Sequence, residues 1–136
     1  MSASPENRDF VRLDPFTVRT DRSEVEAFAR ATGWRGAVET VPFTFPFRWL
    51  TGPIPRAAIN RLLGSETAIL PVHEGQTFER IRDWQMDRDY RLTLDLRREN
   101  APDRLTLRAS IATREGDPCG TLETVLRLVS RQDLQA

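Results

Sequence analysis

The chain has 136 residues, of which 39% are apolar and 29% are charged, a composition typical of one globular domain. Twenty basic and twenty acidic residues give a formal net charge of zero, which argues against nucleic-acid binding because such proteins usually carry a basic surface. All twenty basic residues are arginine, so a lysine nucleophile or a lysine Schiff base is excluded.

Cysteine usage and hydropathy indicate the compartment. Cys119 is the single cysteine, so no disulfide forms within the chain and a reducing environment is favoured. It lies in the turn sequence GDPCG, and we do not expect it to be a nucleophile. No signal-peptide pattern is visible, and no apolar run approaches the roughly 18 residues of a membrane span. We therefore expect a cytoplasmic protein that does not enter a membrane.

The first elements along the chain are an arm, a strand and a helix. Residues 1–9 are polar and predict a flexible arm, and residues 10–136 are expected to form one domain. Residues 16–20 alternate between apolar and polar side chains, which predicts a short strand. A helix is predicted over 21–32, with a serine and a glutamate at capping-box spacing near its start and a glycine after its end.

The segment 33–55 is rich in aromatic residues and proline. VPFTFPF (41–47) is compatible with a short edge strand, since Pro46 would forfeit a hydrogen bond in a central one. A second helix is predicted over 55–63, with proline in its first turn, glycine at its end, and small residues that let a sheet approach closely. Its apolar stripe comprises Ala58, Ile59, Leu62 and Leu63.

From residue 68 onward the pattern is that of β-strands. Apolar residues alternate with polar ones in three long segments near the end of the chain, which predicts antiparallel strands with one face on a core. Glycine, proline, asparagine and aspartate mark the turns between them. The predicted strands are 68–72, 77–84, 90–97, 105–111 and 121–129.

Three sequence elements, in this order, resemble the MaoC family. They are FTFPF, an apolar helix ending in LL, and LPVHEGQTFERIRDW, whose His-x-x-Gln-x-Phe pattern comprises His73, Gln76 and Phe78. The order is similar to the N-terminal dehydratase-like domain of that family and to the non-catalytic subunit of heterodimeric (3R)-hydroxyacyl-ACP dehydratases. The resemblance covers about residues 16–129. It implies an α+β hot-dog fold, in which an antiparallel sheet wraps a central helix.

The resemblance also has implications for activity and assembly. The family's catalytic residues are an aspartate and a histidine just after the first helix, which act through a water molecule on an acyl thioester. Here that region reads ATGWRGAVETVPF and contains neither residue. We therefore do not expect dehydratase activity from this chain alone. Hot-dog domains pair their sheets edge to edge, which implies a homodimer or a heterodimer with a catalytic MaoC-like subunit.

His73 and Glu66 are the candidate catalytic residues. His73 has two interpretations: an acid/base or ligand contact, or a structural residue that forms hydrogen bonds together with Gln76. The structural interpretation is favoured, because no acidic partner is identifiable by spacing and Glu74 would point to the opposite face of a strand. Some hot-dog thioesterases place a carboxylate or an amide near the central helix, which makes Glu66 and Asn60 candidates. Glu66 follows the predicted helix and is expected to be a solvated loop residue.

Binding residues are expected around the aromatic segment. An apolar groove for an acyl chain is expected to be lined by Phe45, Phe47, Trp49 and Ile54, with Asn60 and Gln76 as polar contacts. One histidine and one cysteine cannot supply a closed zinc site, and no glycine-rich phosphate loop is present, so we expect no metal and no cofactor. An arginine strip either meets a CoA phosphate or an acidic carrier protein, or is a solvated sheet face paired across strands with Asp95, Glu99 and Asp103. It comprises Arg97, Arg98, Arg104 and Arg108.

Three functions follow from these observations. The leading hypothesis is a MaoC-like subunit that binds acyl thioesters, as acyl-CoA or acyl-ACP, while a catalytic partner chain supplies the water chemistry. The second is a stand-alone acyl-CoA thioesterase or divergent enoyl-CoA hydratase that uses His73 or Glu66. The third is a non-enzymatic ligand-binding or structural dimer.

Overall fold

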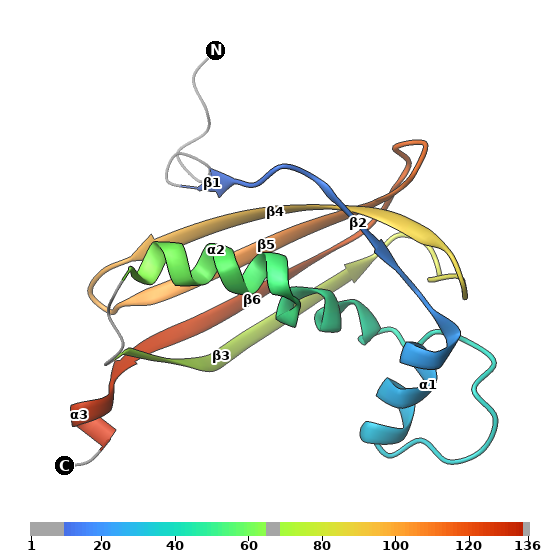
Figure 1. Cartoon of the computed structure of the whole chain (residues 1–136), viewed down its shortest axis with the longest axis horizontal. Helices are drawn as coiled ribbons and strands as arrows, with labels where there is room; N and C mark the ends of the chain where they lie inside the picture. Colours follow the sequence, from blue (N-terminus) through green and yellow to red (C-terminus); the bar gives the residue numbers. More distant parts are fainter. Residues whose placement is uncertain (1–9, 65–68, 135–136) are drawn as a thin grey trace.

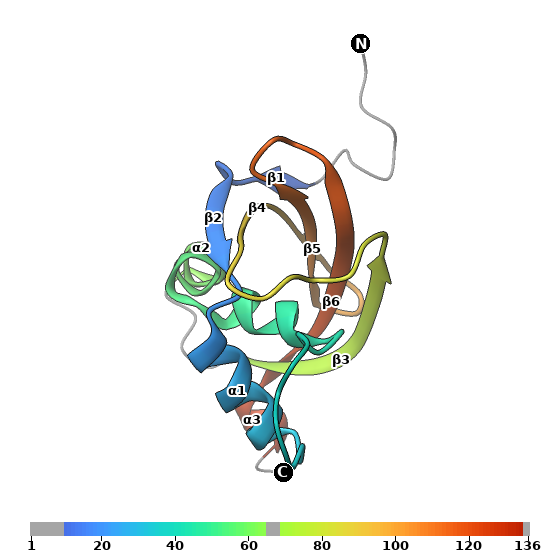
Figure 2. The same ribbon diagram turned by 90° about the vertical axis from the view of Figure 1, so that its right-hand side faces the viewer.

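An antiparallel sheet of six strands forms the frame of the protein (Figure 1). The computed structural model describes residues 10–64 and 69–134. Figure 2 shows the sheet as a curved layer, with the helical segment η2 on its inner side and α2 across its open side. The strand order is β1-β4-β5-β6-β3, and β2 also pairs with β4. The elements are β1 (Val11–Arg12), β2 (Phe16–Arg19), α1 (Arg22–Ala31), η2 (Phe45–Thr51), α2 (Pro53–Leu63), β3 (Ile69–Arg80), β4 (Asp89–Glu99), β5 (Arg104–Thr113), β6 (Pro118–Ser130) and α3 (Arg131–Leu134).

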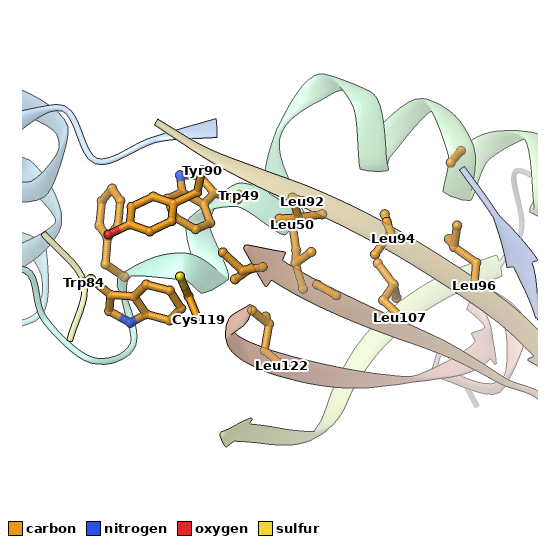
Figure 3. Packing of buried hydrophobic residues seen from close by; sticks show 14 of the residues in the cluster. Trp49, Leu50, Trp84, Tyr90, Leu92, Leu94, Leu96, Leu107, Cys119 and Leu122 are labelled. Carbon is orange, nitrogen blue, oxygen red and sulfur yellow. The ribbon is translucent and has the colours of Figure 1, made fainter. Parts of the chain in front are cut away.

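The inner face of the sheet carries the core. Alternating residues of β4 and β5 lie opposite one another, with Leu92 paired to Ile111 and Leu96 to Leu107. All of these side chains are buried, as the alternation in the sequence predicts (Figure 3). At one end of this face, Trp49 packs against Trp84 and Tyr90, with ring centroids 6.3 and 6.0 Å away.

The aromatic segment is helical, so the expected edge strand over 41–47 is wrong. The backbone N–H of Phe45 donates to the carbonyl of Pro42, and that of Phe47 donates to Thr44, both at the i to i+3 spacing of a 3₁₀ turn. The result is η2, a 3₁₀-helix of seven residues. Pro46 suits its first turn, because a proline there has a helical φ and lacks only an N–H that would be unpaired.

Both predicted helices form, but each begins at a different residue from the one predicted. α1 begins after Asp21, whose side chain makes no capping hydrogen bond, so the expected capping box of Ser23 and Glu26 is wrong. Instead, a carboxylate oxygen of Asp87 accepts a hydrogen bond from the backbone N–H of Arg22 at 2.9 Å. The first N–H of α1 is therefore capped by a residue in the turn before β4. That residue is distant in the sequence, so local spacing does not identify it.

α2 lies along the concave side of the sheet and begins two residues earlier than predicted, at Pro53 (Figure 1). Pro55, Ala58 and Leu63 are its buried residues, and Gly64 ends it with a φ of 63°. The guanidinium of Arg98 on β4 donates to the carbonyl of Leu62 at 3.5 Å, which ties the end of the helix to the sheet. No helix in the described ranges is long and apolar enough to cross a membrane.

β3 differs in extent from the predicted strands. The segments 68–72 and 77–84 were expected as separate strands, but β3 runs unbroken over twelve residues along β6. Residue 68 lies outside the described residues. β3 is the last strand in the order of the sheet, and its outer edge has no partner strand among the residues that the structure describes.

The close approach of β6 to β3 gives a stability prediction. A Cβ added at Gly120 would lie 2.6 Å from the backbone oxygen of Glu79 and 3.1 Å from the Trp84 ring. We expect Gly120→Ala to lower the free energy of unfolding by about 1–3 kcal/mol, because a backbone oxygen cannot yield as a flexible side chain can. Denaturant unfolding measures it. Gly75→Ala is the control, since its Cβ would meet nothing closer than 3.9 Å. Equal stability of Gly120→Ala and the wild type would contradict this packing.

Candidate functional site

A groove of about 340 Å³ lies between α2 and the inner face of the sheet. Helical segments η2 and α2 form one wall, and residues of β3, β5 and β6 form the other. Most of the lining is apolar, with a few polar groups at the boundary, which is the usual composition of a small-molecule site. The lining residues are Phe47, Leu50, Thr51, Arg56, Ile59, Asn60, Pro71, Leu107, Thr124 and Leu126.

A β-bulge in β3 determines which side chains face this groove. His73 pairs with Leu126 and Gly75 with Val125, so Glu74 is an extra residue in the ladder. In a regular strand, positions 73 and 76 would point to opposite faces. The bulge shifts the alternation by one residue, and His73 and Gln76 both lie opposite groove-facing residues of β6.

His73, Gln76 and Thr124 form a polar cluster at the margin of the groove. The hydroxyl of Thr124 donates to Gln76 Oε1 at 2.6 Å, and His73 Nε2 lies 3.3 Å from the same oxygen. Since an amide oxygen can only accept, a hydrogen bond at this contact requires a proton on His73 Nε2. The imidazole is exposed, and its ring centroid is 5.6 Å from that of Phe47, which lines the groove.

Glu74 is directed away from this cluster. Its carboxylate pairs with Arg104 at 2.6 Å and with Arg127 at 2.8 Å. These arginines are paired across β5 and β6 next to inward-facing leucines, so they lie on the outer face of the sheet. Hydrogen bonds from Arg127 and Arg104 lower the pKa of Glu74. The prediction that Glu74 lies opposite His73 is confirmed.

No acidic group is hydrogen-bonded to His73 among the residues that the structure describes. Gln76 cannot ionise, so the cluster can orient a ligand and exchange hydrogen bonds but has no carboxylate partner for a general base. Within the described ranges, no three side chains of histidine, cysteine, aspartate or glutamate gather as metal ligands. Glu66, the second catalytic candidate, lies outside the described residues.

The expected binding residues occupy three different places. Phe47 and Asn60 line the groove, and Gln76 borders it through Thr124. Phe45 was expected in the lining but is fully buried in the core, with its ring edge-to-face against Phe28 and Trp49.

Trp49 and Ile54 lie at a second groove, on the other side of α2. This groove has a volume of about 510 Å³ and lies between β2 and the start of α2. Its two charged lining residues, Glu24 and Arg48, approach to 3.9 Å. Thr51 lines both grooves, so the junction of η2 and α2 separates them.

Sequence reasoning missed Thr124 and Arg56 as site residues. Thr124 interrupts the apolar face of the last strand between two leucines, and a polar residue at such a position is the signal that would have identified it. Arg56 had no such signal, because an arginine on an exposed helix face is ordinary in sequence.

The arginine strip follows the second of its two interpretations. Each arginine pairs with a carboxylate within 3.1 Å, and two of the expected acids, Glu99 and Asp103, are among these partners. Asp95 pairs instead with Arg12 of β1 at 2.8 Å. The charges are therefore paired, but the four arginines do not share one face. Arg97, Arg104 and Arg108 lie on the outer face of the sheet, and Arg98 lies on the inner side, where it also contacts the end of α2. The pairs are Arg97 with Glu99, Arg98 with Asp103, Arg104 with Glu74 and Arg108 with Glu123.

Comparisons with known proteins show the fold. No family model and no curated protein matches the chain. A hot-dog-like protein from Thermanaerovibrio acidaminovorans superposes with a TM-score of 0.62 at 14% identity, covering 93% of this chain and 84% of the other. The HadBC (3R-hydroxyacyl-ACP dehydratase) complex from Mycobacterium tuberculosis gives 0.63 at 16% identity, covering 86% and 93%. PA2801 from Pseudomonas aeruginosa, a putative thioesterase, gives 0.61 at 16% identity, covering 90% and 88%.

The chain has the hot-dog fold. This confirms the predicted α+β class with an antiparallel sheet and a helix along its inner face. Solved hot-dog proteins similar to this chain carry the names of dehydratases, hydratases and thioesterases. At identities of 12–16% among these structures, the similarity concerns the fold.

The ion pairs of Glu74 with Arg104 and Arg127 predict how the stability of the fold depends on pH. The pKa of Glu74 is lower in the folded chain than the usual 4.5, so its ion pairs stabilise the fold above that pH and are lost as the pH falls through the folded pKa. We expect Glu74→Gln to lower the free energy of unfolding at pH 7. The difference from the wild type shrinks below about pH 4.5. Denaturant unfolding at several pH values measures it, with Glu79→Gln on the same strand as control. A difference that does not change with pH would contradict the assignment.

Cys119 gives a reactivity prediction. The thiol is only 2% exposed, and burial raises its pKa, so the thiolate fraction at neutral pH is small. We expect the folded protein to react with a thiol reagent at least about ten times more slowly than the urea-unfolded chain, because burial keeps the reagent from the sulfur and disfavours the reactive thiolate. The unfolded chain should take up one equivalent. Fast labelling of the folded protein would show that this end of the core opens.

Proposed function

We propose that this chain is an acyl-thioester-binding subunit of the MaoC-like hot-dog type, which works with a catalytic partner chain. The observation that carries the proposal is the groove beside α2, with an apolar floor and a polar cluster at its margin. Leu107 and Leu126 form part of this floor, and the surface suits a hydrocarbon chain. The cluster of His73, Gln76 and Thr124 suits the polar end of such a ligand.

The surroundings of His73 favour binding over catalysis. Activation of a water molecule by histidine usually depends on a second group that orients the imidazole and stabilises its charged form. His73 has an amide oxygen in that place. The nearest carboxylate in sequence, Glu74, is held by two arginines on the opposite face of the sheet.

The start of α2 also favours binding over hydrolysis. Thioester hydrolysis needs hydrogen-bond donors for the oxyanion, and backbone N–H groups at a helix start are common donors. Pro53 and Pro55 have no N–H, and the N–H of Arg56 donates to Gly52 within the helix. Ile54 is therefore the residue of the first turn whose backbone N–H makes no hydrogen bond within the helix.

The free edge of β3 supports the partner chain. This strand borders the groove, and its outer edge has no partner strand within residues 10–64 and 69–134. A second hot-dog sheet that pairs along it would place its own residues near His73. We infer a heterodimer with a chain that carries the water-activating aspartate and histidine. A homodimer is the alternative arrangement along the same edge.

The binding test uses a blocking variant. The purified chain should bind decanoyl-CoA, and Leu126→Trp should weaken this binding by at least ten-fold, because the indole fills the groove. Isothermal titration calorimetry measures it. Val125→Trp is the matched control, since it lies next to Leu126 and faces the outer side of the sheet. Equal effects of both variants would contradict the groove as the site.

The activity test separates the three hypotheses. We expect the purified chain to catalyse neither crotonyl-CoA hydration nor acyl-CoA hydrolysis, while it binds acyl-CoA. Turnover that disappears in His73→Ala, with the circular dichroism spectrum unchanged, would favour the stand-alone enzyme instead. Absence of both turnover and binding would favour a structural dimer.

A further inference from the structure

Arg56 is the charged residue of the groove. All other lining residues are apolar or neutral, so its guanidinium sets the electrostatic character of this site. Arg56 and Asn60 are four residues apart on α2 and therefore lie on the same side of the helix. Arg56 Nη2 donates to the backbone oxygen of Thr51 at 2.9 Å, which holds the guanidinium at the η2–α2 junction.

No acidic side chain that the structure describes neutralises Arg56. The segment 40–64, which contains η2 and α2, has no aspartate or glutamate. On the other side of α2, Arg48 has Glu24 at 3.9 Å, so the second groove is charge-paired. Glu74, on the strand bordering the first groove, is held on the outer face by its own arginines. Of the two grooves beside α2, the first is therefore the one whose arginine has no carboxylate partner among the described residues.

We propose that Arg56 binds a phosphate group of the acyl thioester, so that the site selects acyl chains attached to a phosphorylated arm. This inference rests on the proposed function and adds the ligand class that the groove accepts. Arginine suits the role, because its planar fork matches the oxygens of a phosphate and keeps free donors while one N–H is used on Thr51. CoA and the phosphopantetheine arm of a carrier protein share this chemistry.

The test compares charged and uncharged forms of one acyl chain. Wild-type protein is titrated with decanoyl-CoA and with decanoyl-pantetheine, which lacks phosphate. We expect Arg56→Gln to weaken decanoyl-CoA binding about ten-fold, the effect of losing a charge-assisted hydrogen bond, and to leave decanoyl-pantetheine binding unchanged. Wild-type affinity for decanoyl-CoA should also fall as salt is raised, and that of Arg56→Gln should fall less.

A matched control is available on the same helix. Arg61→Gln removes the same charge from α2, and Arg61 is exposed and does not line the groove. It should leave decanoyl-CoA binding within about two-fold, because a solvated charge outside the site contributes little. Should Arg56→Gln fail to fold, Arg56→Lys keeps the charge and should bind decanoyl-CoA more tightly than decanoyl-pantetheine.

Decanoyl-phosphopantetheine, which has the phosphate but not the nucleotide, identifies the source. Arg56 dependence for this ligand supports the arm phosphate, and dependence confined to decanoyl-CoA supports a nucleotide phosphate; both support the inference. Equal binding of charged and uncharged ligands, or equal losses in Arg56→Gln and Arg61→Gln, would overturn the inference and leave the proposed function standing. If the wild type binds none of these ligands, the proposed function fails as well.

Discussion

The fold depends on covering one apolar surface. The inner face of β4, β5 and β6 consists mainly of buried leucines, isoleucine and alanine, and it must be removed from water. The segment from η2 to α2 provides the cover (Figure 2). At one end this cover is tight, where Trp49 and Phe45 pack into the core. Farther along, η2 and α2 stand off from β6, and the groove is the space that remains.

A single extra residue in β3 separates two kinds of surface. The bulge at Glu74 brings His73 and Gln76 to the groove and sends the carboxylate to the outer face. The bulge therefore forms the polar cluster and also places the Glu74 carboxylate on the other face, so that His73 has no carboxylate partner from Glu74. This arrangement around His73 is what the proposed binding role rests on.

The sequence predicted β4, β5 and β6 well because their alternation is strong and local, whereas β1 was not predicted and β3 was expected as two strands. Leu92, Leu94 and Leu96 repeat every second position, and no other element competes for that pattern. The aromatic segment was harder, since Pro46 is compatible with an edge strand and with a 3₁₀ turn, and only the i to i+3 hydrogen bonds decide between them.

The candidate site was only partly predictable for the same reason. His73 and Gln76 were identified from their motif, and the register shift that makes them neighbours is a property of the paired strands. Arg56 and Thr124 join the site through the packing of α2 over β6, a long-range contact; the sequence carries a local signal for Thr124, a polar residue on an apolar strand face, and none for Arg56. Phe45 was misplaced because an aromatic ring in a loop suits a core and a groove equally well.

The open border of β3 has a consequence for handling the protein. Along its outer edge, β3 has no partner strand in the part of the chain that the structure describes, and backbone donors and acceptors on such an edge can pair with another extended chain. Pro71 and the solvent-exposed charges Glu79 and Arg80 discourage indiscriminate additions. The solubility of the protein should therefore depend on whether this edge is covered: co-expression with the proposed partner chain would cover it, and overproduction of the chain alone would leave it open to aggregation.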